Sequence, residues 1–310
     1  MIDQQIGDGG GEAVQTSRRG FILASAAFAV SPALFGKREA IDRYAESQAM
    51  IDEVTPEVWS GYRASGVTRD HAALVALDRA FENVCREASD TPVDGRPAVW
   101  FVYNMGFLVK TREALFSIDL VHPHATELVP RLDFALITHN HGDHYTEAFY
   151  QAMDRAGKTV IQNFSCNYGV RNWRTDGGYT RAEKIFRIKD VTISTALTDH
   201  HDYLVDFTTA FEITSGGFTL YHTGDCSTTK KFRLTKPSPD LWIIHPRCGM
   251  DPCEGAAVVA PKKTVIAHLN EMGHARNRWR WTWQEGLAEK AKLEAAGYAS
   301  VVPLWGERIA

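Results

Sequence analysis

The sequence feature that most constrains this chain is the segment THNHGDHY at 138–145. Three histidines and an aspartate fall within six positions there, directly after the apolar run at 134–137. That run predicts a short buried strand, so the cluster lies at the carboxyl end of the strand. Solvated loops seldom collect imidazoles, and a divalent metal ion is the ligand that imidazole and carboxylate groups most readily share. The segment therefore predicts a metal site with these candidate ligands: His139, His141, Asp143 and His144.

Further ligand candidates follow other predicted strands. His200 and His201 come after the strand expected at 190–197, Asp225 ends the strand-like run 218–225, and His268 lies in the run 263–269. A sheet fixes the backbone at a strand end while the following loop presents the side chains, so such positions suit a rigid site. Because adjacent residues on a strand point to opposite sides, one of His200 and His201 can face the metal and the other cannot.

The chain alternates between strands and helices. Apolar positions are compatible with a helix over 38–54, and a clearer helix contains Leu74, Leu77, Phe81 and Val84, with Thr68 or Asp70 as its expected N-cap. Two later helices are expected at 146–155 and 283–296. The remaining expected strands are 98–103, 107–111, 114–121, 133–138, 158–163, 207–213, 241–246 and 300–305. This order predicts an α/β (α+β) chain.

The ordered series HxHxDH, strand-end histidine, Gly224-Asp225 and His268 resembles the metallo-β-lactamase fold superfamily. The resemblance covers residues 97–310 and implies a four-layer αββα sandwich, with residues 37–96 as an N-terminal helical extension. Within the superfamily, the stretches at 222–226, 246–256 and 303–307 are similar to the branch of ascorbate-6-phosphate lactonase-like and N-acyl phosphatidylethanolamine phospholipase D-like enzymes.

The resemblance also implies a ligand set for two divalent metal ions. His139, His141 and a third histidine hold the first ion, Asp143, His144 and His268 hold the second, and Asp225 bridges them. His200 is favoured over His201 because that branch often has an Asp-His pair there, as at 199–200. Zinc is the first expectation, and manganese or iron also suits these ligands.

The function that follows is metal-dependent hydrolysis of a small ester, lactone or phosphodiester-type substrate, through a hydroxide activated by the dinuclear centre. Asp143 is expected to orient that hydroxide. His274 could donate a hydrogen bond to a substrate oxyanion, and the alternative is a surface or packing role. Two other functions stay open: an iron-dependent redox enzyme of the same fold, and a non-catalytic metal-binding protein.

Other histidines and the Arg-Trp run have plainer interpretations. His222 and His245 lie inside strand patterns and are expected in the core or behind the ligands, while His71, His122 and His124 are expected to be structural. The run RWRWTW at 278–283 could form a cation–π wall over a substrate. Alternatively, its tryptophans face the core and its arginines face water. The helices of 37–96 could cap the cleft, narrow its entrance or mediate dimerisation.

The N-terminus and the composition bear on location and partners. Arg18-Arg19 precede an apolar run of roughly 15 residues, which resembles a twin-arginine export signal over residues 1–36. Export would make the protein periplasmic or secreted, with no stable membrane anchor after cleavage; otherwise it is cytoplasmic. The slightly acidic balance, a net charge of −4, gives no reason to expect a nucleic-acid partner. Export would favour a scavenging or degradative role on small molecules, so a small-molecule substrate is expected. Five cysteines without a close CxxC pair predict no disulfide framework. A homo-oligomer is left open.

Overall fold

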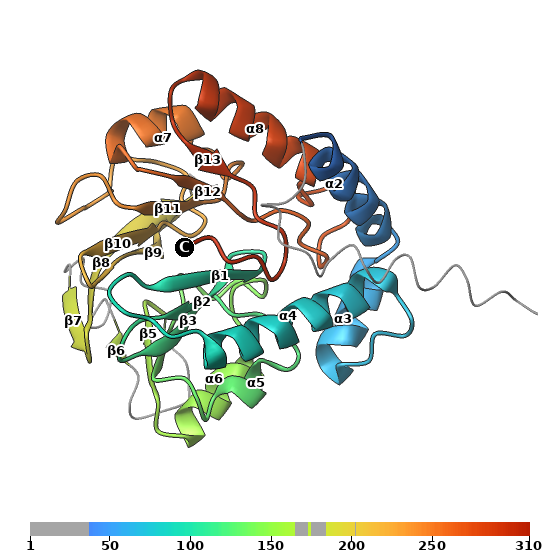
Figure 1. Ribbon diagram of the computed structural model, residues 1–310, viewed down its shortest axis with the longest axis horizontal. Helices are drawn as coiled ribbons and strands as arrows, with labels where there is room; N and C mark the ends of the chain where they lie inside the picture. Colours follow the sequence, from blue (N-terminus) through green and yellow to red (C-terminus); the bar gives the residue numbers. More distant parts are fainter. Residues whose placement is uncertain (1–36, 165–172, 175–183, 202) are drawn as a thin grey trace, which may run out of the picture.

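A computed structural model describes residues 37–164, 173–174, 184–201 and 203–310, and it shows two β-sheets between two layers of helices (Figure 1). The export signal predicted for residues 1–36 lies outside the described residues. So does Cys166, one of the five cysteines. This arrangement confirms the predicted αββα sandwich.

The first sheet has the order β1-β2-β3-β4-β5-β6. Its first three strands are antiparallel, and β3 to β6 run parallel. Parallel strands place their carboxyl ends on one edge, which here carries the segment after β4. The strands are β1 Ala98–Tyr103, β2 Gly106–Lys110, β3 Leu115–Ile118, β4 Phe134–Leu136, β5 Thr159–Gln162 and β6 Trp173–Arg174.

The second sheet has the order β13-β12-β11-β10-β9-β8-β7. Strands β7 to β10 are antiparallel, and β10 to β13 are parallel. The β8–β9 ladder shifts register between Thr198 and His200, so the strand bends just before the histidine. The strands are β7 Lys184–Ile188, β8 Val191–His200, β9 Leu204–Ser215, β10 Phe218–His222, β11 Leu241–Ile244, β12 Thr264–Ile266 and β13 Ser300–Val301.

Helices cover the outer faces of both sheets. In Figure 1, α7 and α8 lie outside the second sheet and α4, α5 and α6 outside the first, while α2 packs against both α4 and α8. The described helices are α2 Lys37–Asp52, α3 Pro56–Ser65, α4 Ala72–Asp90, α5 Ala125–Leu128, α6 Glu147–Arg155, α7 Pro252–Val259 and α8 Trp283–Ala295. None of the described helices is long and apolar enough to cross a membrane.

Helix caps explain where sequence analysis succeeded and where it did not. The expected helix at 283–296 is confirmed, and Thr282 and Glu285 form its capping box. The cap expected at Thr68 or Asp70 is wrong: α4 starts after His71, because Arg69 and Asp70 have left-handed φ values of 47° and 62°. Helix α3 was not expected, although Thr55 caps it and Pro56 occupies its first turn.

The N-terminal helices share one core with the sandwich. Leu77 and Phe81 of α4 are buried in the same cluster as Trp100 of β1. The indole Nε1 of Trp100 donates a hydrogen bond to Glu87 Oε2 of α4 at 2.9 Å. Each large apolar side chain buried in this way contributes about 1.5–3 kcal/mol. Helix α4 therefore packs onto the first sheet, and α2 packs on α4 and α8, so these helices belong to the same folded unit as the sandwich.

Candidate metal centre

The candidate ligands come from carboxyl-terminal strand ends in both sheets. His139 follows β4 of the first sheet, while His200 ends β8 of the second. Asp225 follows β10, and His268 follows β12. The fold brings these four segments to one edge of the sandwich, because ligand atoms from both sheets lie within a few ångströms of one another.

The first cluster consists of His139, His141 and His200. One ring nitrogen from each lies within 4.8 Å of the others. Their ring centroids are 4.6–5.1 Å apart, and the ring planes are nearly perpendicular. Phe207 packs against all three rings. Three nitrogens converging under an aromatic cover match the ligand set of a catalytic metal site that keeps one position open.

The second cluster contains both carboxylates: Asp143, His144, Asp225 and His268, whose ligand atoms also lie within 4.8 Å of one another. His268 Nε2 lies 3.0 Å from Asp143 Oδ2 and 3.2 Å from Asp225 Oδ2. Asp225 also faces the first cluster, with Oδ2 3.6 Å from His200 Nε2. The structure therefore places Asp225 between the two clusters, where a bridging ligand would have to lie.

Buried polar atoms test whether the clusters fit metal ions. His139 Nε2, His144 Nε2 and Asp225 Oδ1 are buried and make no hydrogen bond among the described residues. His144 Nε2 and Asp225 Oδ1 are 3.3 Å apart, but without hydrogen-bond geometry. Buried polar groups in native proteins are nearly always satisfied. These orphaned nitrogen and oxygen atoms therefore fit divalent cations.

Asp119, which sequence analysis missed, supports the clusters from behind. It is fully buried after β3 and accepts hydrogen bonds from Thr138 N at 2.7 Å and Thr138 Oγ1 at 2.6 Å. Its Oδ2 also lies 2.8 Å from His144 Nδ1. That contact fixes the imidazole tautomer so that Nε2 faces the cluster. Sequence analysis placed Asp119 inside the strand expected at 114–121, whereas β3 ends at Ile118 and leaves Asp119 at the strand end, where the other candidate ligands also lie.

Two backbone features hold the ligand loops together. Asn104 donates to the backbone and carboxylate oxygens of Asp143, and its carbonyl accepts from His268 N at 2.9 Å. Gly224 has a φ of 55°, and a Cβ there would lie 2.7 Å from Thr208 Cγ2. Only glycine fits this close approach, so Gly224 allows Asp225 to reach the cluster.

The pKa values of the cluster histidines depend on the balance between burial and the two carboxylates, Asp143 and Asp225. Burial alone would lower the pKa of His268, but Asp225 and Asp143 outweigh it and raise the pKa to about 10. The pKa of His144 is raised well above its usual value for the same reason. In contrast, burial lowers the pKa of His200 to about 4, although Asp225 opposes this. The second cluster thus attracts positive charge, which divalent cations would supply in place of protons.

The other histidines near the strand ends, His201, His222 and His245, lie in three different surroundings. His201 is exposed, has a φ of 59° and lies beside Tyr203, so His200 is the one in the first cluster. His222 is buried and bonded through both nitrogens, to Met105 O and Gly224 N, as expected for a core residue. His245 stacks on His268 with ring centroids 3.9 Å apart.

His274 lies outside both ligand clusters of the described residues. Its Nδ1 is 2.8 Å from Glu271 Oε2, without hydrogen-bond geometry, and its ring meets Trp279 edge-on. Its catalytic role stays a prediction.

The Arg-Trp run has a different burial pattern from either expectation. Arg280 is buried, whereas Trp279 is 54% exposed. The Arg280 guanidinium donates to four backbone carbonyls, those of Ile51, Val54, Met272 and His274. Arginine therefore ties the α2–α3 connection to the loop after His268. The expectation that the tryptophans face the core and the arginines face water is wrong at these two positions.

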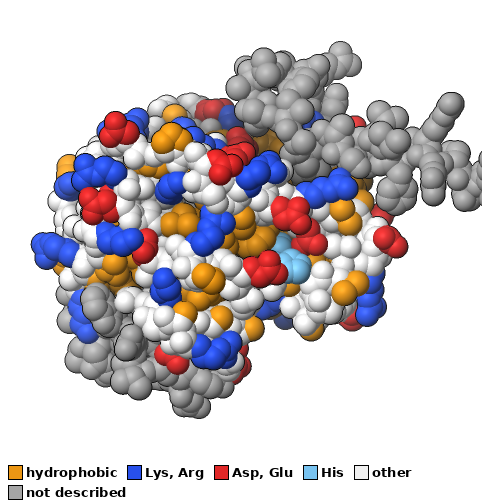
Figure 2. Space-filling model, turned by 60° about the horizontal axis from the view of Figure 1, so that its bottom comes forward, with side chains coloured by type: hydrophobic (Ala, Val, Ile, Leu, Met, Phe, Trp, Pro, Cys, Tyr) orange, Lys and Arg blue, Asp and Glu red, His pale blue; other side chains and the backbone are white. Residues whose placement is uncertain are grey.

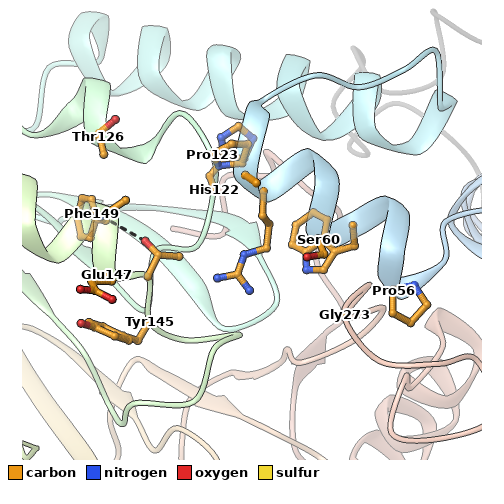
Figure 3. A pocket seen from close by; sticks show the side chains of 14 residues that line it. Pro56, Ser60, His122, Pro123, Thr126, Tyr145, Glu147, Phe149 and Gly273 are labelled. Atoms are coloured by element: carbon orange, nitrogen blue, oxygen red, sulfur yellow. Dashed lines mark hydrogen bonds between the residues drawn. The ribbon is translucent and has the colours of Figure 1, made fainter.

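A cavity of about 580 Å³ lies beside the ligand loop. Figure 3 shows Pro56 and Ser60 of α3 on one side and Tyr145, Glu147 and Phe149 on the other. Tyr145 directly follows His144 in the chain. Figure 2 shows acidic and basic side chains interspersed over the described part of one face, with no continuous field of either charge there.

The layers, the strand orders and the two ligand clusters define an αββα sandwich with a candidate dinuclear metal centre. No protein-family model matches the sequence. Solved structures of this fold do match. A possible metal-dependent hydrolase from Veillonella parvula has a TM-score of 0.53 at 10% identity, over 70% of this chain and 99% of its own. An isothiocyanate hydrolase from Delia radicum gut bacteria has a TM-score of 0.50 at 16% identity, over 69% and 98%.

A third structure belongs to a different chemical class. CmlA, a diiron β-hydroxylase from Streptomyces venezuelae, has a TM-score of 0.51 at 14% identity, over 80% of this chain and 58% of its own. The chain has the metallo-β-lactamase fold, as its sequence predicts. The predicted branch within the superfamily stays a prediction.

Proposed function

We propose that this chain is a metal-dependent hydrolase with a dinuclear centre, acting on a small ester, lactone or phosphodiester. The observation that carries the proposal is the convergence of seven candidate ligands from both sheets into two adjoining clusters that contain orphaned buried atoms. Two divalent ions held there would supply a Lewis acid and a water that loses its proton near neutral pH.

The residues of this chain would divide the tasks by position. His139, His141 and His200 would hold one ion, while Asp143, His144 and His268 would hold the other, with Asp225 shared. Asp119 holds the ring of His144, and Asn104 holds the carboxylate of Asp143. The same Asp143 Oδ2 that accepts from Asn104 lies 3.0 Å from His268 Nε2 and 3.4 Å from His144 Nε2, so this carboxylate faces the cluster, where it could orient a nucleophilic water.

The test is a screen of lactones, phosphodiesters and β-lactams with wild type, Asp143→Ala and His268→Ala. Both variants are expected to fold, because each removes a ligand at a loop and leaves the core intact. Both should lose most activity. Equal turnover in wild type and variants would show that the observed hydrolysis comes from another site or another protein.

The iron-dependent redox alternative has one observation in its favour, the likeness to the fold of a diiron β-hydroxylase. Nitrogen and oxygen ligands suit iron as well as zinc or manganese. Elemental analysis of protein purified without added metal distinguishes the two. Zinc or manganese supports hydrolysis, and a coloured iron centre supports redox chemistry.

We also propose export through the twin-arginine route, which rests on Arg18-Arg19 and the apolar run that follows. Fractionation of cells expressing the full chain, beside a variant with both arginines changed to lysine, tests this. Retention of the variant in the cytoplasm is expected, and equal distribution of both proteins would argue against the signal.

A further inference from the structure

The cavity beside the ligand loop joins the N-terminal helices to the metal centre. Its lining includes Trp59 and Arg63 of α3 and Tyr145, the residue after His144. Arg63 also approaches the loop directly: a Cβ built on Gly142, between His141 and Asp143, would lie 3.9 Å from Arg63 Nη1. A group bound in this cavity would therefore lie against the same loop that carries the candidate ligands.

The Arg63 guanidinium in this lining lacks an acceptor. Arg63 is half-buried, and among the described residues no carboxylate or carbonyl pairs with its guanidinium. The acidic member of the lining, Glu147, accepts a hydrogen bond from Gln151 Nε2 at 3.0 Å. Donors without acceptors favour a ligand that carries acceptors only.

The rest of the lining is largely apolar, with Pro56, Pro123, Tyr145 and Phe149 around the cavity (Figure 3). The polar atoms of His122 are directed elsewhere: Nε2 lies 3.1 Å from Tyr62 Oη, and Nδ1 accepts from His124 N. An aryl or alkyl group would pack against this apolar wall. A guanidinium presents paired donors that match the two oxygens of a carboxylate.

We infer that this cavity binds the carboxylate-bearing aryl or alkyl part of the substrate, and that Arg63 determines specificity by pairing with the carboxylate. The inference rests on the proposed hydrolase function for its role in turnover, but the binding itself does not. Sequence analysis left the role of the N-terminal helices open. On this inference, α3 forms one wall of the substrate site.

Direct binding tests the inference without requiring turnover. Calorimetry on the full-length protein would compare phenylacetate with its neutral isostere phenylacetamide, in wild type, Arg63→Gln and the matched control Arg86→Gln. Arg86 is exposed on α4 and bonds only Asn83 among the described residues. Wild type and Arg86→Gln should bind phenylacetate about tenfold more tightly than phenylacetamide, the scale of one charge-assisted hydrogen bond. Arg63→Gln should lose that preference.

A second variant guards against misfolding of the first. Ser60 is exposed one helical turn before Arg63, so Ser60→Glu would place a carboxylate where it can pair with Arg63. It should weaken phenylacetate binding several-fold without changing the unfolding midpoint. Equal phenylacetate affinity in wild type, Arg63→Gln and Ser60→Glu would overturn the inference, as would equal binding of phenylacetate and phenylacetamide to wild type.

Hydrolysis of a matched pair of esters separates the inference from the proposed function. The substrates are 4-nitrophenyl hydrogen succinate and its neutral methyl ester. The ratio of kcat/KM for the anionic to the neutral ester should fall about tenfold in Arg63→Gln. Absence of hydrolysis with either ester, together with charge-selective binding of phenylacetate, would count against the hydrolase proposal and support the binding site.

Discussion

The ligand clusters and the rim beside them are built in opposite ways. The clusters occupy the ends of four strands, and a short local motif supplies four of their seven members. The rim, defined as α3 and residues 269–283, is held by contacts between segments more than 200 residues apart, such as Arg280 to Val54 O. A strand end is rigid because of its sheet, whereas the rim depends on a few buried polar contacts. We therefore expect changes in the clusters to affect chemistry and changes in the rim to affect stability and selectivity.

Asp225→Ala should have the largest effect, because this carboxylate lies between the two clusters. Bound metal should fall from two ions to one or fewer, and hydrolysis should fall ~1,000-fold or more, which corresponds to about 4 kcal/mol. Elemental analysis and initial rates measure this. Asp251→Ala is the control, since the side-chain hydrogen bonds of Asp251 among the described residues are those that cap α7. Retention of two ions in Asp225→Ala would show that Asp225 does not bridge them.

Arg280→Met tests the rim in isolation. It removes a buried guanidinium that satisfies four carbonyls, so the free energy of unfolding should fall by about 3 kcal/mol. Metal content should not change. Urea unfolding gives the first quantity and elemental analysis the second. The matched control is Arg278→Met, because Arg278 is exposed and stacks over Trp279. Loss of metal from Arg280→Met would mean that the rim also positions the ligands.

Asp119→Asn should weaken metal binding without removing a ligand. An amide cannot hold the Nδ1–H of His144 as a carboxylate does, and loss of such a supporting contact typically reduces metal affinity by about 10–100-fold. Competition with a chromophoric chelator would measure the affinity. Asp133→Asn serves as the control, because Asp133 pairs with Lys189 and Leu115 N, away from both clusters. Equal affinities in the two variants would leave Asp119 with a purely structural role.

The residues alone predicted most of the strands, because buried strands and strand-end motifs are local signals. The sandwich fold and the choice of His200 over His201 came from the resemblance to a known superfamily, and the structure places His200 in the first cluster. Sequence analysis missed Asp119, a single aspartate without a motif. It also missed the burial of Arg280. That burial depends on backbone carbonyls of the α2–α3 connection, which lies more than 200 residues away in the sequence, so no local pattern predicts it. The predicted N-cap of α4 was wrong for a similar reason. The left-handed backbone at Arg69 and Asp70 outweighed the capping propensity of Asp70.

The smallest effect concerns His122, a rim-side histidine that contrasts with the cluster histidines. Burial, and to a lesser extent His124, lowers its pKa to about 3. An unfolded histidine has a pKa near 6.5, so between these values the unfolded chain binds the extra proton. This histidine's contribution to stability is therefore present above pH ~6.5 and is lost as the pH falls toward 3. At pH 5 the loss should be roughly 2 kcal/mol.

Urea unfolding at pH 7.5 and pH 5 should show a smaller pH dependence of the unfolding free energy in His122→Gln by that amount. His71→Gln should behave as wild type, because the half-buried His71 makes no side-chain capping bond at the start of α4. An unchanged pH dependence in His122→Gln would mean that His122 is protonated in the folded protein, paired with Asp78 at 3.4 Å.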